Sequence, residues 1–249
     1  MVSPSCGSWG GVQNVTLLVL DANRGQQIEC GLHQILHHMS ETTSLLTAND
    51  LECTRDDRLL FSGLAFELNA GEVLQIEGPN GSGKTSLLRI LSGLRRADGG
   101  SVRWQQKDIL RARDDYYANM VYIGHLPCIK ADLTTLENIR VLLDTRSQSV
   151  AADQVELALS RVGLAGFEDV AGKALSSGQR RRVLLAFLLL ADARLWILDE
   201  PLTALDVKGV DLVESMILEH RDNGGSVIFT THHGMRLPCE MKTVDLSQC

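Results

Sequence analysis

The chain has 249 residues, of which 44% are hydrophobic and 22% charged. This length suits one large α/β domain, or a core domain with a small additional lobe. The formal net charge of −7 disfavours proteins that grip nucleic acid through a basic face, so we expect no nucleic-acid partner.

The cysteines and the apolar runs limit the class of protein further. Six cysteines are scattered along the chain without a C-x-x-C pair, which suits a reducing cytoplasm better than a disulfide framework. The most apolar run, residues 183–191, ends at Asp192 and is too short to cross a bilayer. We therefore expect any work at a membrane to go through a partner protein.

The first 38 residues differ in character from the rest of the chain. They carry a glycine-rich stretch and a short apolar patch, whereas Met39 opens a polar run typical of a chain start. We interpret residues 1–38 as an N-terminal extension and Met39 as the true initiator; a signal peptide is the alternative, but a basic n-region is missing. His33 and His37 would share a helical face, but without a second half to the ligand set we favour coincidence over a metal or haem site.

From residue 51 the pattern alternates between strands and helices. Strands are predicted at residues 64–68, 73–76, 102–104, 121–123, 195–198 and 227–230. Helices are predicted at residues 84–91, 135–143, 155–162, 179–190 and 207–220. Thr134 and Glu137 form a capping box before the second of these helices. Residues from about 126 to 175 contain helices but no convincing strand, so we expect a helical lobe inserted into a parallel-sheet core.

A complete phosphate-binding loop lies between a predicted strand and a predicted helix. It consists of Gly78, Pro79, Asn80, Gly81, Ser82, Gly83, Lys84 and Thr85. The glycines let backbone N–H groups approach phosphate oxygens, and the helix N-terminus adds a positive dipole end. Lys84 is predicted to contact the β and γ phosphates of a nucleotide, and the Thr85 hydroxyl to ligate Mg²⁺. A glycine-rich turn without this chemistry is the weaker interpretation.

Two carboxylates, Asp199 and Glu200, end the apolar strand at residues 195–198. Ligands bind at the carboxyl ends of strands in parallel sheets, and adjacent buried carboxylates repel unless a cation balances them. We expect Asp199 to hold Mg²⁺, directly or through water, and Glu200 to orient and polarise the attacking water. An acidic strand end that only caps a turn is common for one carboxylate and less so for such a pair.

His232 closes another apolar strand, at residues 227–230. Its imidazole is a candidate hydrogen-bond donor to the γ-phosphate, although a lone histidine at a strand end is often structural. Alternation along the strand would direct the neighbouring His233 away from the site.

A second candidate anion site precedes the helix predicted at residues 179–190. Ser176, Ser177, Gly178 and Gln179 combine hydroxyls, a glycine and a helix N-terminus. Because this surface lies far along the chain from the phosphate loop, an economical interpretation is that it serves a nucleotide held by a second copy of the chain.

In this order, these motifs resemble the nucleotide-binding subunit of an ABC (ATP-binding cassette) ATPase. Residues 175–179 are similar to the Leu-Ser-Gly-Gly-Gln signature, with Ser177 in place of the first glycine, and Asp206 falls in the family's dimer-contact loop. The resemblance covers about residue 49 to the end and implies ATP and Mg²⁺ as ligands. The implied fold is a P-loop NTPase at residues 39–249, with a RecA-like parallel-sheet core, an antiparallel β region and an α-helical subdomain at about 126–175. It also implies an ATP-sandwich dimer in which Ser176 and Gly178 cover the partner's nucleotide, and hydrolysis by Glu200, His232 and Lys84.

Within that family, residues 57–64, 123–127, 164–169 and 195–204 resemble the ATP-binding subunit of the bacterial cytochrome c maturation system, historically described as a haem exporter. This resemblance implies an integral membrane subunit and haem-handling membrane proteins as partners. It also implies a peripheral position on the cytoplasmic side of the inner membrane. The implied work is haem export or, more plausibly, release of a haem-loaded chaperone.

Three positions depart from the family pattern. His125 stands where most ABC ATPases place a glutamine that contacts Mg²⁺ and the attacking water. The loop before residue 60 offers Arg55 and no aromatic ring to stack on adenine, which predicts relaxed choice among ATP, GTP and CTP. Phe187 replaces an arginine usual in the relatives, which indicates a more apolar core.

Four functions other than cytochrome c maturation are alternatives for this chain. The first is the ATPase of a different small exporter. A soluble ABC protein of ribosomes or DNA usually carries two cassettes or a long coiled coil, and neither is seen here. A phosphate-loop kinase has no use for the signature or His232. A non-hydrolysing regulatory subunit is disfavoured because Lys84, Asp199 and Glu200 are all present.

Overall fold

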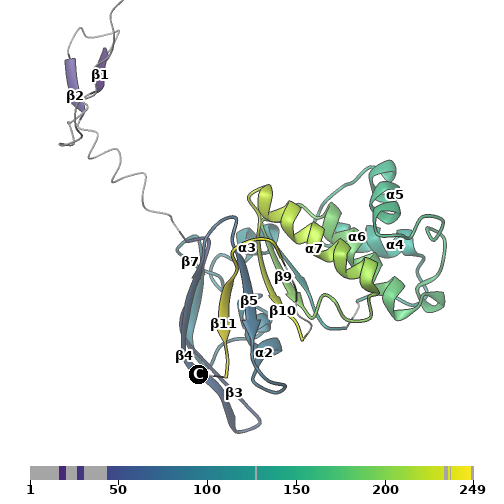
Figure 1. Cartoon of the computed structure of the whole chain (residues 1–249), viewed down its shortest axis with the longest axis horizontal. Helices are drawn as coiled ribbons and strands as arrows, with labels where there is room; N and C mark the ends of the chain where they lie inside the picture. The colour runs from purple at the N-terminus through teal and green to yellow at the C-terminus, as the bar shows by residue number, and fades with distance from the viewer. Residues whose placement is uncertain are drawn as a thin grey trace, which may run out of the picture. The chain divides into compact units, whose positions relative to one another are not determined.

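The computed structural model describes residues 17–20, 27–30, 44–126, 128–232, 235 and 237–247 (Figure 1). The chain divides into two compact units, residues 1–43 and residues 44–249. In the first unit two short strands, β1 (Leu17–Leu20) and β2 (Gln27–Cys30), pair antiparallel. His33, His37 and the suggested initiator Met39 lie outside the described residues, so the interpretation of the extension stays a prediction.

The second unit contains all the other strands and helices described. Its strands are β3 (Leu46–Arg55), β4 (Arg58–Leu68), β5 (Val73–Glu77), β6 (Gly99–Trp104), β7 (Lys107–Asp108), β8 (Met120–Ile123), β9 (Leu195–Asp199), β10 (Ser226–Thr230) and β11 (Lys242–Asp245). Its helices are α2 (Lys84–Leu91), α3 (Arg113–Asn119), α4 (Thr135–Asp144), α5 (Ala152–Arg161), the 3-10 turn η1 (Gly172–Ala174), α6 (Ser177–Leu190) and α7 (Val207–Asp222). Among the described residues, no helix is long and apolar enough to span a membrane.

A parallel five-stranded sheet forms the centre of this unit, in the order β11-β5-β10-β9-β8. Every residue of β9 and β10 is buried. Alternate residues of β9 belong to two separate hydrophobic cores. Trp196 and Leu198 pack with the helices α4 to α7, whereas Leu195 and Ile197 pack with α2 and α3. This two-sided burial explains the continuous apolar runs in the sequence. All four strands predicted for this sheet are confirmed.

An antiparallel sheet, in the order β4-β3-β6-β7, packs with α2 in the second core. It contains the predicted strands at residues 64–68 and 102–104. Strand β3 was not predicted, nor were the short β7, the edge strand β11 and helix α3. In β3 the register against β4 shifts between Ala48 and Leu51, so the period-two alternation that marks a strand is interrupted.

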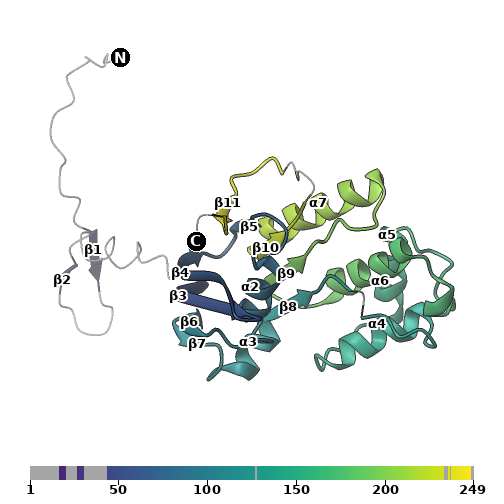
Figure 2. The same ribbon diagram turned by 90° about the horizontal axis from the view of Figure 1, so that it is seen from below.

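Helices α4 and α5 follow β8 and precede α6 along the chain. Both pack on α6, at the end of the unit away from the antiparallel sheet (Figure 2). The capping box of Thr134 and Glu137 is present at the start of α4, with the predicted reciprocal hydrogen bonds. Helix α6 begins at Ser177, two residues before the predicted start, because Ser176 caps it. Phe187 is 7% exposed in the helical core, as its apolar side chain predicts.

A half-buried histidine joins α7 to the parallel sheet. The imidazole of His220 stacks on the indole of Trp196, with ring centroids 3.8 Å apart and planes 6° from parallel. Burial lowers the pKa of His220 to about 4, although backbone carbonyls of Arg194 and Ser226 partly oppose the shift. The folded protein therefore favours neutral His220.

This packing predicts that stability falls in mild acid. In the unfolded chain His220 takes up a proton near its ordinary pKa of about 6.5, so its contribution is complete above that pH and is lost as pH falls from 6.5 toward 4. After allowance for its partial exposure, we expect a loss on the order of 1 kcal/mol in unfolding free energy between pH 7.5 and 5. Urea unfolding at both pH values measures it. His220→Gln should reduce the pH dependence, whereas His125→Gln should retain it.

Candidate functional site

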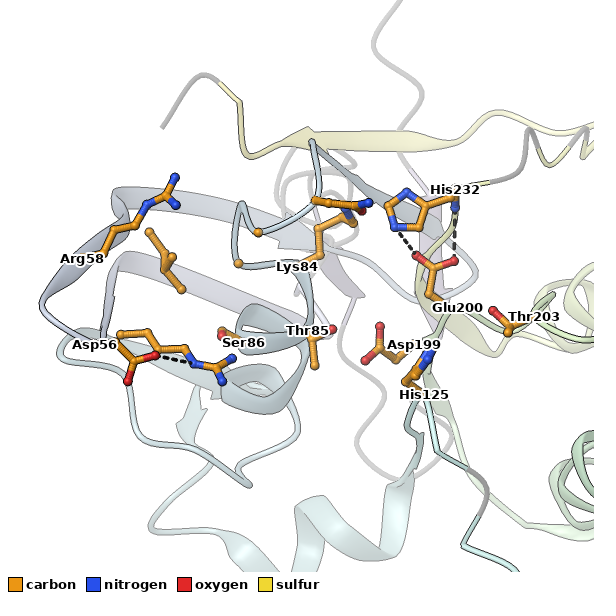
Figure 3. Close-up of a pocket in the computed structure, with 15 residues that line it drawn as sticks. Asp56, Arg58, Lys84, Thr85, Ser86, His125, Asp199, Glu200, Thr203 and His232 are labelled. Atoms are coloured by element: carbon orange, nitrogen blue, oxygen red, sulfur yellow. Dashed lines mark hydrogen bonds and ion pairs between the residues drawn. The ribbon is translucent and has the colours of Figure 1, made fainter. Parts of the chain in front are cut away.

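A cleft of about 650 Å³ opens at the carboxyl ends of the parallel strands (Figure 3). It brings together the phosphate loop, the acidic end of β9, the histidine after β10 and the start of β4. The lining residues are Arg55, Asp56, Arg58, Leu60, Asn80, Gly81, Gly83, Lys84, Thr85, Ser86, His125, Asp199, Glu200, Thr203 and His232. Residues separated by more than 140 positions in the sequence thus share one cavity.

The phosphate loop has the backbone that its glycines predict. Gly78, Gly81 and Gly83 adopt φ values of 141°, 82° and 105°, which L side chains rarely tolerate. At Gly78 a Cβ would also lie 2.6 Å from the Ser82 hydroxyl. Gly83 caps α2 without a side-chain hydrogen bond, so the helix presents free N–H groups to the cleft.

Lys84 folds over this loop and is only 8% exposed. Its ammonium group donates to the carbonyls of Gly78 at 2.7 Å and Pro79 at 3.1 Å. These contacts hold the cation at the mouth of the loop, where it can meet an anionic ligand.

The two carboxylates at the end of β9 are buried, with Asp199 1% and Glu200 8% exposed. The hydroxyl of Thr230 on β10 joins them: it donates to Asp199 Oδ1 at 2.9 Å and accepts from the Glu200 N–H at 3.0 Å. Asp199 Oδ2 is buried without a hydrogen-bond partner, and Glu200 Oε1, which is also buried, makes no hydrogen bond but lies 3.3 Å from the ring Nε2 of His232. Buried anionic oxygens of this kind require a ligand that brings positive charge or donors.

The unpartnered oxygen of Asp199 agrees with the predicted Mg²⁺ site. Thr85 lines the same cleft as Asp199, and Figure 3 shows their side chains facing each other across it. A carboxylate oxygen and a hydroxyl, with room for phosphate oxygens and water, suit a hard divalent cation that prefers oxygen ligands. The residues present therefore fit Mg²⁺ held together with a nucleotide.

The two histidines of the cleft lie on opposite sides of the acidic pair. The imidazole Nε2 of His232 is 3.3 Å from Glu200 Oε1, and the His232 N–H donates to Glu200 Oε2 at 3.2 Å. His125, which follows β8, lies beside Asp199 (Figure 3). His233 is outside the described residues, so its predicted orientation stays untested.

The signature residues do not line this cleft. Ser176 and Gln179 form a capping box at the start of α6, each side chain bonded to the other's backbone N–H. At Gly178 a Cβ would lie 2.7 Å from the carbonyl oxygen of Ala204, so only glycine allows this approach. Ser177 is the first residue of the helix. The single chain therefore keeps its second candidate anion surface apart from its phosphate loop.

Asp206 caps α7 and also lies outside the cleft. Its carboxylate accepts from the Gly209 N–H at 3.0 Å and pairs with Arg182 at 2.6 Å. The Gly209 hydrogen bond, with the Arg182 charge, lowers the pKa of this exposed carboxyl. Asp206 thereby connects the start of α7 to α6 through Arg182.

The rim of the cleft near β4 carries Arg55, Asp56 and Arg58 beside Leu60. Arg55 and Asp56 form an exposed ion pair at 3.4 Å. None of the cleft-lining residues is a phenylalanine, tyrosine or tryptophan. Sequence reasoning missed Arg58, although its place three residues after Arg55, across the β3–β4 turn, offered a signal.

Sequence reasoning also missed Arg181, which stands within a run of three arginines. It is not part of a basic surface: it is 3% exposed and lies beneath the acidic turn. Burial lowers the pKa of its guanidinium, and the charges of Asp199 and Glu200 oppose the shift. Only the packing of α6 against the ends of β8 and β9 reveals this role.

Comparisons with known proteins agree on the kind of site. Residues 61–203 match the family model described as ABC transporter. The chain is 50% identical over 202 residues to the cytochrome c biogenesis ATP-binding export protein CcmA of Methylococcus capsulatus, covering 81% of this chain and 98% of that protein. It is 49% identical over 205 residues to the protein of the same name from Escherichia coli K12, covering 82% and 97%.

Solved structures share the fold. A putative ABC transporter ATP-binding protein from Pyrococcus furiosus superimposes with a TM-score of 0.71 at 23% identity, covering 82% of this chain and 98% of that one. An ATP-binding subunit of an ABC transporter gives 0.68 at 21% identity, covering 76% and 80%. Together with the two sheets described above, these neighbours confirm the predicted P-loop NTPase fold of ABC type.

The bridge through Thr230 yields a prediction. Thr230→Val keeps the shape of the side chain but leaves the Glu200 N–H and Asp199 Oδ1 without their partner, so the unfolding free energy should fall by about 1–3 kcal/mol. Denaturant unfolding measures the loss, and Thr230→Ser, which keeps the hydroxyl, should remain close to wild type. Equal stability of the valine variant would show that the hydroxyl does not bridge the turn.

Proposed function

Because the chain belongs to the ABC transporter family of ATP-binding proteins, we propose that this ATPase drives a membrane complex for c-type cytochrome biogenesis. The support is the half-identity, over nearly their whole length, to relatives named as cytochrome c biogenesis ATP-binding export proteins. The single observation that carries the chemistry is the buried carboxylate pair, Asp199 with its unpartnered Oδ2 and Glu200 beside His232, in the same cleft as the phosphate loop.

In the proposed site the phosphate loop binds ATP. The N–H groups at the start of α2 and the Lys84 ammonium contact the β and γ phosphates, and Lys84 exchanges its loop carbonyls for phosphate oxygens. Thr85 and Asp199 would hold Mg²⁺, which would neutralise charge that develops on the phosphates. His125 lies beside Asp199 and supplies one imidazole where relatives place a glutamine.

Glu200 is the proposed catalytic base. Its carboxylate would orient the attacking water and accept its proton as the water oxygen bonds to the γ-phosphorus and the bridging oxygen departs with ADP. His232 contacts both Glu200 oxygens in this structure, through its ring nitrogen and its backbone N–H. We assign to His232 the task of holding Glu200 in line and donating a hydrogen bond to a γ-phosphate oxygen.

The lid over this nucleotide comes from a second copy of the chain. ABC ATP-binding subunits dimerise and work with membrane subunits, and we infer that Ser176, Ser177 and Gly178 of the partner close over ATP bound at residues 78–85. Asp206 lies in the contact between the copies. The separation of the signature from the cleft within one chain supports this arrangement. ATP then joins the two copies, and hydrolysis releases them.

The finer partners are also part of the proposal. We infer an integral membrane subunit and haem-handling membrane proteins as partners, and a peripheral position on the cytoplasmic face of the inner membrane. ATP turnover would serve haem export or the release of a haem-loaded chaperone.

The assignment of Glu200 as catalytic base predicts that a variant without its carboxylate stays in the ATP-bound state. Glu200→Gln should lower kcat by at least about 100-fold, the usual worth of a general base, while binding of MgATP is kept. The variant should form a stable ATP-bound dimer, measured by light scattering with and without ATP. Turnover at the wild-type rate would remove Glu200 as the base. As a contrast, Lys84→Ala should lose nucleotide binding and remain monomeric with ATP.

A cellular test addresses the biological role. Glu200→Gln or Lys84→Ala, expressed in place of the wild-type chain, should abolish assembly of c-type cytochromes. Haem staining of membrane fractions measures this assembly. Normal cytochrome levels would redirect the proposal to a different small exporter.

The arginine-lined rim of the cleft predicts weak discrimination among the nucleobases of the bound nucleoside triphosphate. Without an aromatic ring on the cleft wall, a guanidinium plane from Arg55 stacks on any base, so Kd values for ATP, GTP and CTP should agree within about tenfold. Calorimetry with the Glu200→Gln variant measures binding without turnover. A preference for ATP beyond 100-fold, or unchanged affinities in Arg55→Ala, would contradict this assignment.

A further inference from the structure

We propose that Arg181 is a positioning residue that sets the acidic turn at Asp199–Glu200 for hydrolysis and ties it to the signature helix. This inference rests on the proposed function, since it assigns Arg181 its effect through Glu200.

The guanidinium of Arg181 makes four hydrogen bonds, and all of them go to backbone carbonyls at the ends of two neighbouring strands. Nη2 donates to Asp199 O at 3.0 Å and to Glu200 O at 2.6 Å, and Nε donates to Pro201 O at 3.2 Å. Nη1 donates to Gly124 O, directly before His125, at 3.0 Å. A planar fork with fixed donor directions can hold three consecutive carbonyls and a fourth from the next strand.

These bonds hold a turn that is unfavourable on its own. Glu200 adopts a φ of 51°, a left-handed conformation that costs energy for a residue with a side chain. In a regular strand, Asp199 and Glu200 would point to opposite faces of the sheet. The left-handed backbone lets both carboxylates line the same cleft. The catalytic geometry therefore depends on contacts that keep the turn in this conformation.

Two groups supply those contacts from opposite sides. Thr230 holds the Glu200 N–H and one Asp199 oxygen, as described above. Arg181 holds the carbonyl side of the turn and places a buried positive charge beneath two buried negative ones. Without Arg181, three consecutive carbonyls lose their donor and the strained residue is free to relax.

The position of Arg181 on α6 gives these contacts a second consequence. Arg181 lies about one turn after Ser176, which caps that helix and belongs to the lid proposed for the partner's nucleotide. The next residue, Arg182, bonds Asp206 of the dimer-contact loop. Movement of α6 as its lid closes on the partner's ATP is thus transmitted through one rigid side chain to the base that cleaves the chain's own ATP.

The chain contains a matched control for this contact. Arg146 likewise donates to four backbone carbonyls, those of Tyr117, Ala118, Met120 and Asp192. These lie at the amino-terminal ends of β8 and β9, at the opposite end of the same two strands from the cleft. Arg146→Gln therefore removes the same kind of bond without touching the site.

The test is a double-mutant cycle on ATP hydrolysis in single turnover, with rates normalised to bound nucleotide so that unfolded protein does not contribute. Arg181→Gln should slow hydrolysis by about 10-fold to 100-fold, as expected for a misplaced catalytic group, with the Kd for MgATP within about threefold of wild type. Arg146→Gln should lower the melting temperature, because it also removes bonds to four carbonyls, but should hydrolyse bound ATP at the wild-type rate. Arg181→Lys, which keeps the charge without the fork, should recover part of the rate.

The cycle separates positioning from general damage. If Arg181 acts through Glu200, adding Arg181→Gln to Glu200→Gln should not slow the residual rate further, because the base it positions is already absent. Multiplicative losses, or a wild-type rate per bound nucleotide in Arg181→Gln, would overturn the inference. Should Arg181→Gln fail to fold, the same cycle with Arg181→Lys decides the matter by the same criteria. A wild-type rate for Glu200→Gln alone defeats the proposed function itself, whereas a stalled Glu200→Gln beside an unimpaired Arg181→Gln defeats only this inference.

Discussion

The conformation of one buried turn, Asp199 to Pro201, is the constraint on which the candidate site depends. Strand alternation would separate its two carboxylates, and a left-handed Glu200 brings them into one cleft. Such a backbone persists only where the surroundings hold it. Here Thr230 and Arg181 do so from opposite sides, so the side chains of β10 and α6 determine where the two carboxylates proposed for hydrolysis lie.

The charge pattern around this turn explains why the site calls for a cation. Asp199 and Glu200 are nearly inaccessible, and Arg181 is the buried cation beneath them. The guanidinium donates only to carbonyls, so Asp199 Oδ2 stays unpartnered and Glu200 Oε1 has the His232 ring as its neighbour. Buried anionic oxygens without donors are unfavourable until a metal ion or water meets them. Binding of Mg²⁺ with a triphosphate would relieve this cost, which would couple ligand affinity to the residues proposed to carry the reaction.

The two candidate anion-binding surfaces of the chain lie on different elements. Helix α6, which carries the second surface, contacts the acidic turn of the cleft that contains the first. The phosphate loop is anchored by β5 and α2, whereas the signature caps α6. Gly178 packs against the Ala204 carbonyl, Arg182 bonds Asp206, and Arg181 bonds the acidic turn. A nucleotide held between two copies would therefore be sensed in both sites through main-chain contacts rather than through ligand contacts alone.

Short-range patterns of glycine, apolar runs and caps were enough to predict the buried parallel strands, the phosphate loop, the acidic pair and the capped helices. They did not reveal β3, whose register shift interrupts the alternation, or the edge strand β11, which is short. The burial of Arg181 beneath Glu200, the place of Arg58 in the cleft wall and the distance of residues 176–179 from the cleft became visible only in the folded chain. Those facts depend on how α6 packs across the ends of β8 and β9, a long-range contact that no local spacing of residues specifies.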